Sequence, residues 1–72
     1  MEYELVHEIK NSCPNNQMRD VFIEEVETDD PVSFVRAQLR GRIDELTAEE
    51  RSDGVTIHAV CDGLLHVFTF TL

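Results

Sequence analysis

The chain of 72 residues has no tryptophan and only two cysteines, two prolines and three glycines. One potential bridge is too few for a secreted disulfide scaffold, which normally carries several. Hydrophobic residues make up 42% of the chain, which is ordinary for a folded protein and argues against disorder. The composition therefore indicates a single small domain, residues 1–72, with a thin core of aliphatic residues and a few phenylalanines.

Basic residues are also scarce, because six Lys and Arg stand against 15 Asp and Glu and the net charge is −9. Such a surface repels nucleic acid and anionic membranes, so we expect neither as a partner. No apolar run is long enough to span a membrane, and residues 1–5 lack the features of a signal peptide. We expect a cytoplasmic protein whose easiest partner is basic, although an acidic surface can also serve solubility alone.

Two stretches of the first half are predicted to be strands. In residues 2–10, apolar residues alternate with charged ones, which is typical of a strand with one buried face that includes His7. Residues 18–28 fit either a helix or a strand. Their β-branched and aromatic residues, among them Val21, Phe22 and Ile23, favour the strand. Between the two lies a loop of Asn, Ser and Pro residues.

A helix is predicted over Pro31–Arg40. Asp30 can cap its free amides, Pro31 suits the first turn, and Gly41 suits the end. The buried stripe should contain Phe34, Val35 and Leu39.

The last third of the chain is predicted to be an antiparallel meander with turns at Asp53-Gly54 and Asp62-Gly63. Residues 42–51 could begin a short helix, but a polar edge strand is more economical. The expected fold is α+β in the order β-β-α-β-β-β, with one helix on one face of a mainly antiparallel sheet of about five strands. The uncharged strand 67–72 should be central in this sheet or paired across a dimer.

The cysteines and histidines suggest two kinds of chemistry. Cys13, in the first loop, is the candidate reactive thiol, although no nearby group would lower its pKa. Cys61 should point inwards and act as a small hydrophobic residue. His58, Cys61 and His66 are zinc-ligand types. However, residues three apart on a strand face opposite sides, so we expect no metal site there.

Arg36, Arg40 and Arg42 form a candidate patch for an anion or a partner, unless Glu24, Glu25 or Asp44 neutralises them. No phosphate loop, catalytic signature or cofactor motif is present in the sequence. We therefore expect a small, acidic, non-enzymatic binding module that contacts a protein partner or a second copy through a sheet edge. The alternative is a thiol-dependent accessory protein for redox, metal or chalcogen handling that uses Cys13.

Overall fold

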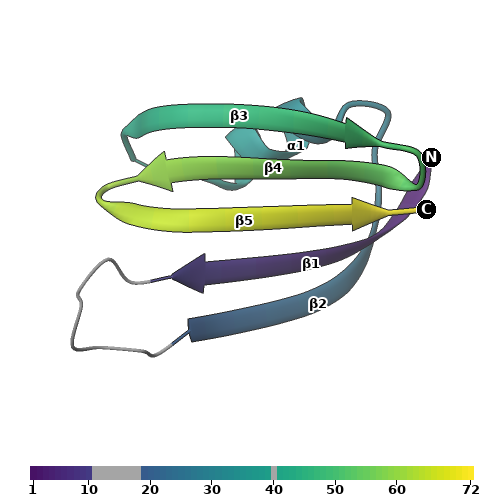
Figure 1. Cartoon of the computed structure of the whole chain (residues 1–72), viewed down its shortest axis with the longest axis horizontal. Coiled ribbons are helices and arrows are strands. Elements are labelled where there is room, and N and C mark those ends of the chain that lie inside the picture. Colours follow the sequence, from purple (N-terminus) through teal and green to yellow (C-terminus); the bar gives the residue numbers. More distant parts are fainter. Residues whose placement is uncertain (11–18, 40) are drawn as a thin grey trace.

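A computed structural model of the chain describes residues 1–10, 19–39 and 41–72. Five antiparallel strands form one sheet in the order β2-β1-β5-β4-β3, accompanied by one helix (Figure 1). The elements are β1 (Glu2–Lys10), β2 (Arg19–Glu27), α1 (Pro31–Gln38), β3 (Ile43–Arg51), β4 (Gly54–Cys61) and β5 (Leu64–Thr71). This is the predicted α+β fold with the predicted element order. The two uncertain segments of the sequence contain the strands Arg19–Glu27 and Ile43–Arg51, as predicted, and residues 11–18, predicted as a loop up to residue 17, lie outside the described residues.

The strand order places β2 and β3 at the two edges of the sheet. The chain segment that contains α1 therefore connects one edge to the other, which leaves the helix against a single face of the sheet (Figure 1). The C-terminal strand β5 lies in the middle, paired with β1 on one side and β4 on the other. One of the two predicted places for this uncharged strand is thus confirmed.

The helix begins as its sequence predicts. The Asp30 carboxylate accepts hydrogen bonds from the amides of Val32 and Ser33 at 3.1 and 3.4 Å, and Pro31 occupies the first turn. The described helix ends at Gln38, two residues before the predicted end. Leu39 is extended, with φ −80° and ψ 124°, and its N–H donates to the Val35 carbonyl. Its side chain packs against the core.

The two hairpins of the meander use different turns. Asp62 and Gly63 lie at the centre of the β4–β5 turn with φ 51° and 81°, as the Asp-Gly dipeptide predicts. In the β3–β4 hairpin the turn residues are Ser52 and Asp53, so the predicted position is one residue too late. Gly54 instead opens β4, where a Cβ would collide with the Phe70 carbonyl. This close approach of the β5 backbone requires glycine.

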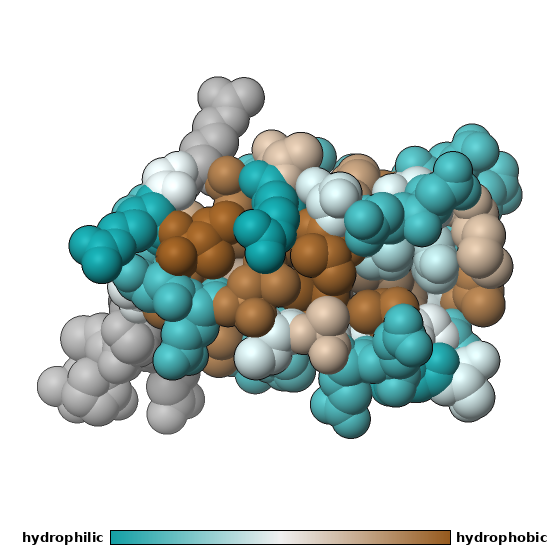
Figure 2. All heavy atoms as spheres, turned by 90° about the horizontal axis from the view of Figure 1, so that it is seen from above, coloured by the Kyte–Doolittle hydropathy of each residue, from teal (hydrophilic) through white to brown (hydrophobic). Residues whose placement is uncertain are grey.

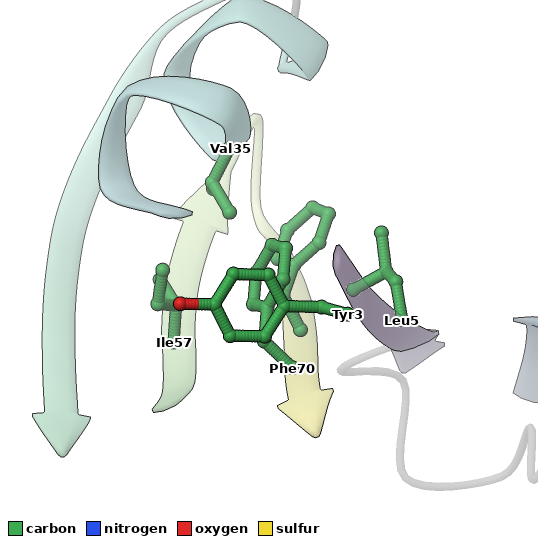
Figure 3. Close-up of a cluster of buried hydrophobic side chains, with 6 residues drawn as sticks. Tyr3, Leu5, Val35, Ile57 and Phe70 are labelled. Atoms are coloured by element: carbon green, nitrogen blue, oxygen red, sulfur yellow. The ribbon is translucent and has the colours of Figure 1, made fainter. Parts of the chain in front are cut away.

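The core lies between α1 and the sheet, on what we call the helix face. Tyr3, Leu5, Ile57 and Phe70 lie on the side of the sheet that faces the helix, and Val35 points from the helix towards this side (Figure 3). Phe68 belongs to the same cluster. Seen from above, hydrophobic residues gather along the middle of the molecule between hydrophilic ones (Figure 2). The alternation of the last strand would place Leu72 on the same inward face as Phe68 and Phe70. Leu72 instead follows the last residue of β5, leaves the alternation and is 62% exposed.

The opposite side of the sheet, which we call the open face, is covered by no helix of the described part of the chain. The strand alternation places two kinds of residue on it. Apolar ones such as Val6, Ile23 and Val67 lie near carboxylates such as Glu4 and Glu25.

Candidate functional site

The strand β2 is an edge strand whose only described neighbour is β1. All nine residues, Arg19–Glu27, are in register with β1, from Lys10↔Arg19 to Glu2↔Glu27. The other side of the strand carries backbone N–H and C=O groups, and none of the described strands lies beside them. A long edge of this kind is a ready template for pairing with another segment.

Three consecutive large apolar residues lie exposed in the middle of this edge. Val21, Phe22 and Ile23 are 47%, 53% and 69% exposed. Val21 and Ile23 lie on the open face, whereas Phe22 lies on the helix face with its ring 5.9 Å from that of His7. Clusters of exposed apolar residues often mark interaction sites.

The other edge of the sheet is built differently. β3 reads IDELTAEER, and its only described partner strand is β4, with a register irregularity between Ile43 and Glu45. Charged side chains and bulges are the usual means of discouraging edge-to-edge pairing. Each edge strand contains four acids and one arginine, so charge alone does not distinguish them. The edges differ because β3 has the register irregularity and no exposed large apolar residue, whereas the centre of β2 has three.

Four glutamates meet on the open face where β1 and β2 pair, and we call this group the carboxylate corner. Glu2 lies directly opposite Glu27, and Glu4 lies directly opposite Glu25. They line a groove of about 430 Å³ together with Thr71 and Leu72. Within residues 1–10, 19–39 and 41–72, no cation forms an ion pair with any of the four. Like charges directly opposite each other in a sheet are destabilising.

The carboxylate corner was not predicted from the sequence, because the four glutamates belong to two strands whose pairing the sequence does not show. The spacing of Glu2 and Glu4, and of Glu25 and Glu27, was a usable signal. Residues two apart on a strand share a face, but only the register of the hairpin shows that the two pairs coincide.

A pair of histidines lies on the helix face. His7 Nε2 and His66 Nδ1 are 3.0 Å apart, so one imidazole donates and the other accepts. The His7 ring stacks on Phe68 with ring centroids 4.0 Å apart. Burial lowers the pKa of both histidines, and the neighbouring His66 lowers that of His7 further. Both rings are therefore neutral at neutral pH and act as half-buried parts of the core, as predicted for His7.

Of the three residues of zinc-ligand type, Cys61 and His66 line one pocket on the helix face together with His7, whereas His58 does not. His58 is exposed on the open face, whereas Cys61 and His66 lie on the helix face, as the strand alternation predicted. Among the described residues, no group of three histidine, cysteine or acidic side chains could hold a metal ion.

The structure describes one of the two cysteines, Cys61, and not the other, Cys13. Cys61 is only 4% exposed, as predicted, and its thiol lies 4.0 Å from the Asp62 carboxylate. Desolvation raises the pKa of this thiol, and the charges of Asp62 and Asp44 raise it further. It is therefore a poor nucleophile. Cys13, the candidate reactive thiol, lies outside the described residues, and its role stays a prediction.

The structure describes two of the three arginines of the candidate patch, Arg36 and Arg42. Arg36 is exposed on α1, whereas Arg40 lies outside the described residues. The Arg42 guanidinium forms an ion pair with Asp44 at 2.9 Å, which is one of the neutralising contacts considered from the sequence. A role for the three arginines in binding an anion or a partner stays a prediction.

Comparisons with known proteins identify no relative of this chain, so the fold and the surfaces described above are the basis for its function. No family model, curated protein or solved structure matches the chain. In the described part of the chain, no helix has the length and apolar character needed to cross a membrane.

Proposed function

We propose that this protein is a non-enzymatic binding module that takes up an extended segment of a partner protein along β2. The observation that carries the proposal is the exposed run Val21–Phe22–Ile23 at the centre of an edge strand. Added strands gain affinity from main-chain hydrogen bonds and specificity from alternate side chains. The β3 edge supports the choice of β2, since β3 has a register irregularity and no exposed large apolar residue.

The exposed apolar residues also indicate how tight such binding should be. Fully burying a Val, Ile or Phe side chain contributes about 1.5–3 kcal/mol, and roughly half to two thirds of that remains available at the three positions. Association itself costs at least about 4 kcal/mol. Main-chain pairing must supply the rest, so we expect dissociation constants of about 1–100 μM rather than nanomolar binding.

The described chemical groups support a non-enzymatic role. The Cys61 thiol is buried with a raised pKa, and the His7–His66 pair is satisfied by its own hydrogen bond. The low cysteine content supports a cytoplasmic location for the module.

The proposal is tested with nine-residue peptides of alternating valine and threonine, in amide NMR titrations and hydrogen exchange. We expect chemical-shift changes and slower exchange on β2, and none on β3. A peptide N-methylated at every residue keeps its side chains but can donate no main-chain hydrogen bond along either edge, so it should not bind. Ile23→Lys should weaken binding, whereas Thr47→Lys on the open face of β3 should not.

Two results would overturn the proposal. One is that neither the valine–threonine peptides nor variants of them that contain charged residues affect the β2 amides at about 1 mM. The other is protection of the β2 amides that rises with protein concentration alone. That result would show that a second copy of this chain, and not a different partner, occupies the edge.

A further inference from the structure

We infer that the segment bound along β2 is basic, with Lys or Arg side chains over the carboxylate corner formed by Glu2, Glu4, Glu25 and Glu27. This inference rests on the proposed function and adds the chemical class of the partner. It is carried by the position of the corner, at one end of the same edge whose centre is apolar.

The facing glutamates of the corner repel each other, and a cationic partner would reduce this repulsion. Glu4 faces Glu25 and Glu2 faces Glu27 across adjacent strands, where opposite residues have Cβ atoms about 5 Å apart. Three described cations pair with other acids: the N-terminal amine contacts Asp29, Arg42 contacts Asp44, and Arg51 contacts Asp53. A Lys or Arg supplied from outside thus finds carboxylates that compete for no ion pair within the described chain.

The alternation of β2 specifies where the charges of the partner should lie. On the open face, the strand presents Val21 and Ile23 in one half and Glu25 and Glu27 in the other. A segment added to this edge continues the same two faces. Its open-face residues should therefore be apolar beside the first half of β2 and basic beside the second.

This order defines a short test peptide. If the segment runs antiparallel to β2, it meets Glu27 first and Val21 last. The sequence Lys-Thr-Lys-Thr-Val-Thr-Val then places its two lysines beside Glu27 and Glu25, and its two valines beside Ile23 and Val21. The threonines alternate onto the helix face.

The charge of the protein as a whole favours the same class of partner. The net charge is −9, and β2 itself contains four acids and one arginine. Pairing two copies of β2 would bring two such acidic strands together, which like-charge repulsion opposes. A basic segment of another protein avoids that repulsion and is attracted from a distance.

The experiment compares three peptides that differ only at the two lysine positions, which carry Lys, Gln or Glu. Binding is measured from the shifts of β2 amides at low salt. Each opposite-charge pair in a sheet contributes modestly, so the Lys peptide should bind about tenfold more tightly than the Gln peptide. The Glu peptide should bind most weakly. The advantage of Lys should disappear at about 1 M salt, where screening is strong.

Two double variants locate the effect. Glu4→Gln with Glu25→Gln removes one facing pair of the corner, whereas Glu45→Gln with Glu49→Gln removes two carboxylates from the open face of β3. Both variants change the net charge equally. The advantage of the Lys peptide should fall severalfold in the first variant and remain in the second.

The outcomes separate this inference from the proposed function. If the Gln peptide binds β2 and the Lys peptide binds no better, the module stands but its partner is not basic. If both double variants reduce the Lys advantage equally, the overall charge and not the corner attracts the peptide, and the inference is again wrong. If no peptide affects β2, the proposed function itself fails.

Discussion

Replacing Glu25 by lysine should stabilise the fold while it removes the preference for a basic partner. Glu25 lies on the open face of the edge strand, directly opposite Glu4. The substitution converts a repulsive cross-strand pair into an attractive one. Glu49→Lys is the matched control, because Glu49 lies on the open face of the other edge strand but opposite Thr56. Both substitutions change the net charge by the same amount.

The size of the effect follows from the register. Two unit charges about 6 Å apart in water interact by about 0.7 kcal/mol. The change from repulsion to attraction is then about 1.4 kcal/mol, and screening in about 0.1 M salt lowers it to about 0.8 kcal/mol. In a domain of this size, that corresponds to a rise in the melting temperature of about 3–6 °C.

Urea denaturation at low and high salt provides the assay, since guanidinium chloride would itself screen the charges. Glu25→Lys should raise the urea midpoint more than Glu49→Lys does, and the difference should shrink at about 1 M salt. Equal effects of the two substitutions at low salt would refute the reasoning. The stabilisation would then come from net charge, not from the facing pair.

Other predictions concern the core, the helix cap, the thiol and the histidines. Val35 is fully buried, so Val35→Ala should lower the free energy of unfolding by about 2–3 kcal/mol in urea titrations. Asp30→Ala removes the helix cap, and a lower melting temperature by circular dichroism is expected. The Cys61 thiol should react with iodoacetamide more slowly than free cysteine at neutral pH, as followed by mass spectrometry. Burial lowers the pKa of His7 and His66 below the ordinary 6.5, so the unfolded chain takes up protons first as the pH falls. The free energy of unfolding should therefore decrease on acidification through about pH 6.5, and His7→Phe should flatten this dependence in urea titrations at several pH values.

The carboxylate corner illustrates how a binding surface can cost stability. Its facing glutamates repel each other in the free protein, and a more stable arrangement is one substitution away. Sites that serve binding often depart from what stability alone would favour. If Glu25→Lys stabilises the fold and weakens binding of the lysine peptide together, the repulsion and the binding have the same origin.

The local features of this protein were determined by its sequence alone. Asp62-Gly63 adopts positive φ at both positions, and Asp30 caps α1, because these residues favour their conformations without help from distant parts of the chain. The alternation of residues 2–10 likewise predicted that Tyr3 and Leu5 point inwards. These are short-range preferences, and they were sufficient to predict the element order and the fold class.

The identity of the edge strands and the contents of the surfaces were decided only by the tertiary structure. The sequence shows strands but not their order, so it could not reveal that β2 lies at an edge with Phe22 exposed. His7 and His66 are 59 residues apart and meet only because β1 pairs with β5. Glu4 faces Glu25 only in the observed register, and a slip of one residue would place them on opposite faces. Pairing between distant strands depends on the whole core packing at once, and no local pattern encodes it.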